Sequence, residues 1–199
     1  IRNVVFLGHS GSGKTTFIET MLFESGIIPR RGSVEAHNTI SDFTDLERER
    51  ENTIYNHLMH AKWHNNKINI IDTPGFDDFI GEVVSSLKVS DTALILLNAA
   101  SGVEVGTEIV WEYVQNYQTP ALFVINQMDH PKADYDTTLE QAKNRFGNKV
   151  IPIQYPYNSG EKFNSIIDVL RMTMYVFPEN GGKPEKMPIP ASELEKANA

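Results

Sequence analysis

Short apolar runs alternate with amphipathic stretches over most of the chain. The runs that predict strands buried in a parallel sheet lie at residues 3–8, 93–97 and 121–125. Apolar residues recur at helical spacing in three stretches, residues 14–24, 80–87 and 109–117. Strands that alternate with helices predict an α/β fold with a doubly wound, mostly parallel sheet, helices on both faces and right-handed crossovers.

The segments between these elements are less regular. Residues 27–52 are polar, have no period and predict a long loop, which in a compact domain is usually functional. Residues 53–63 and 67–72 predict two strands joined by a tight hairpin turn at Asn65-Asn66. A helix at 136–146 and a strand at 149–153 are predicted to extend the sheet.

The pattern weakens after Tyr155. Residues 178–190 are rich in Pro and Gly and predict a linker, and residues 192–198 predict a short helical tail. We therefore expect a core at residues 1–155 and the beginning of an inserted subdomain, with its tail, at residues 156–199.

Composition excludes several classes to which the protein could belong. A formal net charge of −8 argues against a general polyanion binder, although one local site can still hold phosphates. The absence of cysteine fits a cytoplasmic chain and excludes disulfides and thiolate metal sites. The apolar runs fall far short of the roughly 20 residues of a membrane span, so no membrane contact is expected. Because the chain opens without methionine and directly on a strand, we expect trimmed ends.

A glycine-rich motif joins the first predicted strand to the first predicted helix. It fits the Walker A pattern and comprises Gly8, His9, Ser10, Gly11, Ser12, Gly13, Lys14 and Thr15, followed by Thr16. Small residues let backbone N–H groups turn toward a phosphate at a helix N-terminus. Lys14 can carry charge to the terminal phosphates, and the Thr15 hydroxyl can ligate Mg²⁺.

The tetrapeptide Asp72-Thr73-Pro74-Gly75 follows another predicted strand. It places Asp72 at the carboxyl end of a strand beside the glycine-rich loop, where a carboxylate can hold Mg²⁺, usually through water. The N–H of Gly75 can meet a γ-phosphate. Alone, the tetrapeptide would be an ordinary turn, but its distance from the Walker A motif favours the phosphate site.

Asn126-Gln127-Met128-Asp129 ends the predicted strand at residues 121–125. Asp129 can accept both guanine ring N–H protons, which adenine does not offer, and Asn126 can tie the loops together. Gln127 stands where lysine is usual and keeps an aliphatic stem over the base. This motif predicts selection of guanine over adenine.

The charged end of the long loop, residues 47–54, contains Thr53. By its spacing from the other motifs, Thr53 is a candidate second Mg²⁺ ligand that senses the γ-phosphate. The alternative is a solvated turn of alternating charge before a strand.

Taken together in order, GHSGSGKTT, LERERxxTI, INIIDTPG and NQMD, with IPIQYP and SIID after them, resemble the GTPase domain of elongation factor G over residues 2–199. The resemblance implies GTP and GDP as ligands, Mg²⁺ as the ion, a monomer in the cytoplasm, and the ribosome as the partner in translocation. It implies catalytic roles for Lys14, Thr53 and Gly75. It also implies that the chain ends within an insertion, before the last guanine-binding loop.

The chain departs from this family at several positions. Phe76 stands in place of the histidine that orients the attacking water, and phenylalanine cannot form that hydrogen bond. Gly11 replaces an aspartate, Ser10 an apolar residue, and Glu51-Asn52 a Gly-Ile pair. These departures predict a divergent paralogue that binds GTP but hydrolyses it slowly.

Three other functions stay open at this point. The chain can be a ribosome-binding module that binds GTP without effective hydrolysis, which Phe76 favours. It can belong to a ribosomal protection factor, since such proteins are similar in this domain. An ATP-using enzyme is the fourth class, and Asp129 argues against it.

Overall fold

The computed structural model describes residues 1–41, 44–50, 53–75, 80–179 and 182–198. The chain forms two units, which are described separately. The first unit consists of residues 1–98 and 103–126, and the second of residues 99–102 and 127–199.

A five-stranded sheet forms the centre of the first unit, with the strand order β2-β3-β1-β4-β5. The strands are β1 (Arg2–Leu7), β2 (His57–Trp63), β3 (Asn66–Asp72), β4 (Thr92–Asn98) and β5 (Ala121–Asn126). β1 pairs in parallel with β3 and β4, and β4 with β5, whereas the edge strand β2 is antiparallel to β3. The predicted fold class, an α/β sheet with mostly parallel strands, is confirmed.

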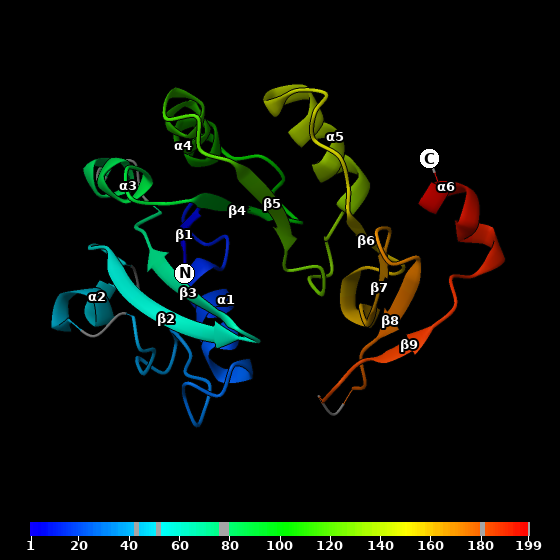
Figure 1. Cartoon of the computed structure of the whole chain (residues 1–199), viewed down its shortest axis with the longest axis horizontal. Coiled ribbons are helices and arrows are strands. Elements are labelled where there is room, and N and C mark those ends of the chain that lie inside the picture. Colours follow the sequence, from blue (N-terminus) through cyan, green and yellow to red (C-terminus); the bar gives the residue numbers. More distant parts are fainter. Residues whose placement is uncertain (42–43, 51–52, 76–79, 180–181, 199) are drawn as a thin grey trace. The chain divides into compact units, whose positions relative to one another are not determined.

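Helices cover both faces of this sheet, as Figure 1 shows. α3 (Ile80–Leu87) and α4 (Val105–Asn116) pack on one face, and α1 (Lys14–Glu24) packs on the other. Successive strand residues point to opposite faces, so Val5 and Leu7 contact the α3 and α4 side whereas Phe6 contacts the α1 side. All three are fully buried. The sequence of the central strand β1 is therefore continuously apolar at these positions, because both faces of the strand are covered.

The hairpin between β2 and β3 differs from the prediction by one residue. Trp63 pairs with Asn66, so the turn residues are His64 and Asn65, and Asn66 already belongs to β3. His64 has the positive φ, 50°, that we expected of asparagine. Asparagine tolerates this conformation well, but the register of β2 against β3 decides which residue must adopt it.

The polar segment before β2 was predicted to be loop up to residue 52 and strand from residue 53, and both predictions were wrong in part. A short helix, α2 (Asp45–Arg50), forms within the predicted loop. The strand begins only at His57, because the N–H groups of Ile54, Tyr55 and Asn56 donate to glutamate side chains instead of to a neighbouring strand.

The second unit contains α5 (Tyr135–Phe146) and a separate four-stranded antiparallel sheet. Its strands are β6 (Gln154–Pro156), β7 (Ser165–Asp168), β8 (Thr173–Val176) and β9 (Glu185–Met187), and its short helices are η2 (Gly160–Lys162), η3 (Ala191–Glu193) and α6 (Leu194–Asn198). A small core joins this sheet to the end of the chain and contains Tyr155, Ile167, Met174, Ile189 and Ala197. The division of the chain at residue 155 stays a prediction.

Two expectations for this part of the chain were wrong. Residues 149–153 are not a strand of the first sheet; β6 begins at Gln154 and pairs with β7 in the second sheet. The predicted linker at 178–190 contains β9, which pairs with β8 through Tyr175 and Lys186. Pairing with β8, the preceding strand, orders this Pro- and Gly-rich stretch, and composition alone does not indicate such pairing.

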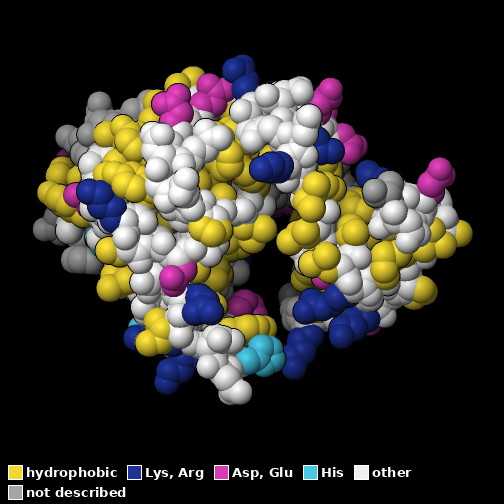
Figure 2. Space-filling model, turned by 45° about the horizontal axis from the view of Figure 1, so that its top comes forward, with side chains coloured by type: hydrophobic (Ala, Val, Ile, Leu, Met, Phe, Trp, Pro, Cys, Tyr) yellow, Lys and Arg dark blue, Asp and Glu magenta, His cyan; other side chains and the backbone are white. Residues whose placement is uncertain are grey.

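On the face drawn in Figure 2, acidic and basic side chains lie among one another. Figure 2 shows Lys and Arg side chains in dark blue beside Asp and Glu side chains in magenta, with uncharged residues around them. This mixture agrees with the modest net charge of −8. Within the ranges that the structure describes, no helix is long and apolar enough to cross a membrane.

Candidate nucleotide-binding site

The glycine-rich loop runs from the end of β1 to the start of α1, as its sequence predicts. Two of its glycines are required by geometry. A Cβ on Gly8 would lie 2.5 Å from the backbone oxygen of Leu96, and Gly8 has a φ of 136°. Gly13 is the N-cap of α1 with a φ of 90°, a conformation that side chains with a Cβ disfavour. Glycine at position 8 lets the loop pass tightly against β4, and glycine at position 13 lets the chain turn into α1.

The N-terminus of α1 is open to an anion. Among the described residues, no side chain caps it, and its first turn contains no acidic residue. The first N–H groups of a helix have no intrahelical partner and carry the positive end of the helix dipole. This combination is typical of a phosphate site.

Lys14 brings a positive charge to the same place. Its side chain is buried, and its Nζ donates to the carbonyl oxygens of Gly8 (2.8 Å) and His9 (3.1 Å). Burial lowers the pKa of Lys14 to about 8, although the carboxylate of Asp72 acts in the opposite direction. The ammonium group is therefore charged at neutral pH but poorly hydrated, which favours contact with an anionic ligand.

Three oxygen atoms from distant parts of the sequence meet beside the loop. The Thr15 hydroxyl donates to Asp72 Oδ2 at 3.0 Å, and it lies 3.2 Å from the Thr53 hydroxyl. Asp72 is fully buried and Thr53 is 7% exposed. Hydroxyl and carboxylate oxygens are the ligands that a hard divalent cation prefers, so the donor set fits Mg²⁺. The structure thus brings together the three residues that the sequence predicted as metal ligands.

The turn after β3 is held against the glycine-rich loop. The buried hydroxyl of Thr73 donates to the carbonyl oxygen of Phe6 at 2.6 Å. A Cβ on Gly75 would lie 2.6 Å from Lys14 Nζ and 2.8 Å from the Cα of Ser10. Only glycine allows such a close approach, which places the backbone of Gly75 beside the Lys14 ammonium group.

Asn126 connects the end of β5 to the glycine-rich loop, because its Nδ2 donates to the carbonyl oxygen of Ser12 at 2.9 Å. This contact agrees with the predicted role of Asn126 in tying the loops together. Gln127 and Asp129 belong to the second unit, so their place relative to the loop stays a prediction. Gln127 has a positive φ of 59°, and Asp129 is exposed.

Comparison with known proteins decides the family. The model of the elongation factor Tu GTP-binding domain matches residues 1–192. The chain belongs to this family. Such an elongation factor Tu-type domain binds guanine nucleotide, and the resemblance to the elongation factors noted in the sequence is confirmed.

Individual relatives specify the type of elongation factor that this domain resembles. Elongation factor G of Mycoplasma pneumoniae is 38% identical over 192 residues, which are 95% of this chain and 28% of that protein. The elongation factor G-like protein of Thermotoga maritima is 31% identical over 188 residues, 94% of this chain and 27% of that protein. A crystal structure of a Thermus thermophilus protein superimposes with a TM-score of 0.92 at 32% identity, covering 99% of this chain and 29% of that one.

These relatives identify a translational GTPase domain of the elongation factor G type. The chain spans little more than a quarter of the length of the relatives it matches, 28% and 27% for the two named proteins. Similarity alone therefore does not assign the activity of a whole elongation factor to this domain.

The other predicted residues of this elongation factor Tu-type site have varied surroundings. The hydroxyl of Ser12 is buried and has no hydrogen-bond partner among the described residues, so it can serve as a donor to a ligand. His9 Nε2 lies 3.7 Å from Glu104 Oε1, and Ser10 is half-buried. Gly11 and Thr16 are exposed. Phe76 lies outside the described residues, and its predicted effect on hydrolysis stays a prediction.

Sequence reasoning missed one functional candidate in this domain, Glu47. It is fully buried within a charged run, and its carboxylate contacts the segment that carries Thr53. A signal for it was present: Thr44-x-x-Glu47 has the spacing of a helix capping box. The Glu47 N–H does donate to the Thr44 hydroxyl, at 3.3 Å, at the start of α2.

We expect the Gly75→Ala substitution to weaken binding of a guanosine triphosphate by about tenfold, roughly the effect of losing one hydrogen bond. The added methyl group would meet the Ser10 backbone at 2.8 Å and force the turn away from the loop. Equilibrium binding of a fluorescent triphosphate measures the effect. Gly81→Ala in α3 is the matched control, since its Cβ would meet nothing within 4 Å. Equal affinities of the two variants would contradict the prediction.

We also expect Glu47 to contribute to the loss of folded-state stability at acid pH. Burial by itself raises the pKa of Glu47, but hydrogen bonds from Thr44, the Ile54 N–H, His57 and the Tyr55 N–H outweigh it and lower the pKa from 4.5 to about 2. A lowered pKa stabilises the folded state above pH 4.5, and this contribution is lost as the pH falls toward 2. It amounts to at most about 3 kcal/mol.

Urea unfolding at several pH values measures this effect. Between pH 6 and pH 3, approximately, the Glu47→Gln variant should lose less free energy of unfolding than the wild type, because glutamine does not titrate. Glu49→Gln, an exposed change in the same helix, should follow the wild type. Parallel pH profiles for wild type and Glu47→Gln would contradict the assignment.

Proposed function

We propose that this domain binds GTP or GDP together with Mg²⁺ and acts as the nucleotide-dependent switch of a translation factor that works on the ribosome. The observation that carries the proposal is the meeting of Thr15, Asp72 and Thr53 beside the buried Lys14. Thr53 follows a long polar segment, so it can bring that segment to the nucleotide or release it.

Each residue has a distinct task in this proposal. The N–H groups at the start of α1 and the Lys14 ammonium group bind the phosphates. Thr15 and Asp72 would hold the cation. Thr53 would add its hydroxyl to the same cation when a γ-phosphate is bound. Mg²⁺ in such a site neutralises charge on the β- and γ-phosphates.

The guanine base is assigned to Asn126, Gln127 and Asp129. Asp129 is exposed and free of any burial cost, so its carboxylate can accept the two ring N–H protons of guanine. Asn126 fixes the start of this motif to the loop through Ser12. A site that pairs with these protons discriminates strongly against adenine, which lacks them.

The second candidate is a ribosome-binding module in which GTP stabilises the bound form and is not hydrolysed effectively. Phe76 favours it, because the position that supplies a water-orienting histidine in the resembling family holds a side chain without hydrogen-bonding atoms. Both candidates share the same nucleotide site and differ in whether the γ-phosphate is cleaved.

Nucleotide binding by the whole protein tests the shared part of the proposal. We expect GTP and GDP to bind with Mg²⁺, triphosphate binding to weaken when EDTA removes the ion, and ATP to bind at least about 100-fold more weakly. Asp129→Ala should remove this preference without changing ATP binding. Tighter binding of ATP than of GTP would overturn the proposal.

The ribosomal part needs a separate measurement. Sedimentation with purified ribosomes should recover more protein in the presence of a non-hydrolysable GTP analogue than in the presence of GDP. Single-turnover hydrolysis with and without ribosomes then separates the two candidates. Strong stimulation by ribosomes would exclude the binding module without hydrolysis.

A further inference from the structure

Within the described ranges, the Glu47 carboxylate makes four hydrogen-bond contacts next to the candidate site. It is 0% exposed and lies on α2. Its Oε2 accepts from the Thr44 hydroxyl at 2.6 Å, and its Oε1 lies 2.8 Å from His57 Nε2. The same Oε1 accepts from the N–H of Ile54 at 3.0 Å and of Tyr55 at 3.2 Å. One buried side chain thus joins α2 to the start of β2.

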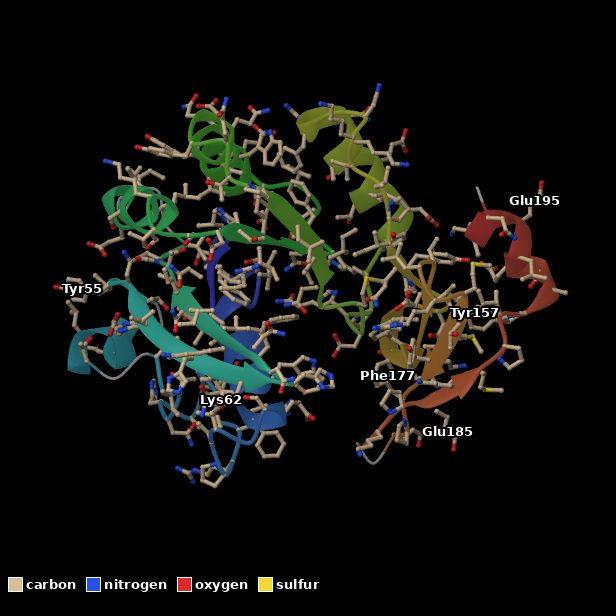
Figure 3. The ribbon with its side chains drawn as sticks, viewed as in Figure 1. Tyr55, Lys62, Tyr157, Phe177, Glu185 and Glu195 are labelled. Atoms are coloured by element: carbon tan, nitrogen blue, oxygen red, sulfur yellow. The ribbon has the colours of Figure 1, made fainter. Side chains whose placement is uncertain are left out.

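These contacts lie directly beside Thr53. Ile54 and Tyr55 follow it in the chain, and His57 is the first residue of β2. The labelled Tyr55 lies beside α2 with its side chain directed outward (Figure 3), and it is 52% exposed. Its backbone N–H, not its ring, therefore makes the inward contact with Glu47.

A second carboxylate supports the same stretch from another helix. The N–H of Asn56 donates to Glu82 Oε2 at 3.2 Å, and its side-chain amide donates to the Glu82 carbonyl oxygen at 2.8 Å. Glu82 belongs to α3, so this contact ties the segment to the helix that follows residues 76–79. The backbone after Thr53 is consequently held by two acidic side chains rather than by strand pairing.

We expect the hydrogen bonds between Glu47 and the backbone after Thr53 to form or break together. A buried carboxylate is tolerated only when hydrogen-bond donors compensate for its lost hydration. If residues 53–55 moved away, Glu47 would lose two backbone donors and would have to reach water. Conversely, the two N–H groups would lose their acceptor. The position of Thr53 is therefore coupled to the burial of Glu47.

The geometry points to Glu47, supported by His57, as the positioning residue that holds Thr53 where its hydroxyl lies 3.2 Å from that of Thr15. The inference rests on the proposed function, since it assigns Glu47 to the triphosphate-specific state of that nucleotide site. Glu47 does not touch the nucleotide in this scheme. It acts on the backbone that presents Thr53.

Nucleotide selectivity of the whole protein tests this role. With Mg²⁺ present, Glu47→Ala should reduce the preference for a non-hydrolysable GTP analogue over GDP by about tenfold, the effect of losing one or two backbone anchors. GDP affinity should stay within about twofold of the wild type, because GDP does not engage Thr53. A loss of both affinities alike, or an unchanged preference, would overturn the inference.

Two further variants separate positioning from general stability. Glu47→Gln keeps an oxygen that can accept from both N–H groups, so it should retain most of the preference. Glu49→Ala changes an exposed glutamate of the same helix and should behave as the wild type. If Glu49→Ala lowered the preference as much as Glu47→Ala, the effect would belong to α2 as a whole and the inference would fail.

Hydrogen exchange gives a readout that does not depend on nucleotide. Without any ligand, the amides of Ile54 and Tyr55 should exchange at least about tenfold faster in Glu47→Ala than in Glu49→Ala, whereas Glu47→Gln, which keeps the acceptor oxygen, should stay close to Glu49→Ala. Equal exchange rates in Glu47→Ala and Glu49→Ala would overturn the inference even if guanine nucleotide binds. Failure of the wild type to bind any guanine nucleotide would instead refute the proposed function.

Discussion

The Lys14→Met substitution is expected to weaken binding of GTP and GDP by about 100-fold. Lys14 is buried at the N-terminus of α1, where its ammonium group would face a bound phosphate. A charge-assisted hydrogen bond contributes up to about 3 kcal/mol, which corresponds to about 100-fold in affinity. Methionine keeps the aliphatic stem, so the change removes charge without opening a cavity.

Isothermal titration of GDP into the wild type and the variant measures this effect. Lys62→Met is the matched control, because Lys62 is exposed on β2, as Figure 3 shows. Unfolding curves check that Lys14→Met is folded, because methionine removes the donor to the Gly8 and His9 carbonyl oxygens as well as the buried charge. A Lys14→Met variant that binds as tightly as Lys62→Met would place the phosphate site elsewhere.

The Phe76→His substitution is expected to raise the rate of GTP hydrolysis by about 10² to 10⁴, the usual contribution of a group that positions or accepts a proton. The reason lies in the chemistry of the side chain. Histidine can orient the attacking water by a hydrogen bond, whereas phenylalanine has no atom that can do so. Single-turnover hydrolysis in the presence of ribosomes is the measurement.

Phe76→Leu serves as the control for this prediction, because leucine also lacks hydrogen-bonding atoms and should leave the rate unchanged. Nucleotide affinity should be alike in both variants, so that the effect appears in the chemical step. If the wild type already hydrolyses GTP rapidly on ribosomes, Phe76 does not limit catalysis and the proposal of impaired hydrolysis is wrong.

Much of the site could be predicted because its motifs are local. The glycine-rich loop from Gly8 to Thr15 requires only a strand before it and a helix after it. Nearby apolar residues predict both of these elements. Asp72 was expected beside Thr15 because parallel strands end at the same edge of a sheet. The 3.0 Å contact between their side chains agrees with that reasoning.

Element boundaries were less accurate where side chains replace strand partners. The predicted strand from residue 53 begins at His57, because Glu47 and Glu82 accept the intervening N–H groups. Those acceptors come from two helices, and the Thr44-x-x-Glu47 spacing indicates only the start of a helix, not that the Glu47 carboxylate accepts from the backbone after Thr53. The second sheet was missed for a related reason, since β9 depends on pairing with β8, the strand before it in the chain.

The sequence by itself indicated the glycine-rich loop between β1 and α1, the strands and helices of the first sheet apart from α2, and the resemblance to the elongation factors, because glycines, apolar runs and short motifs depend mainly on neighbouring residues. Only the tertiary structure decided where Thr53 lies and what holds it there. That position depends on Glu47, which is buried beneath the segment and bonded to His57 at 2.8 Å. Burial of a carboxylate among its donors arises only when distant elements pack together.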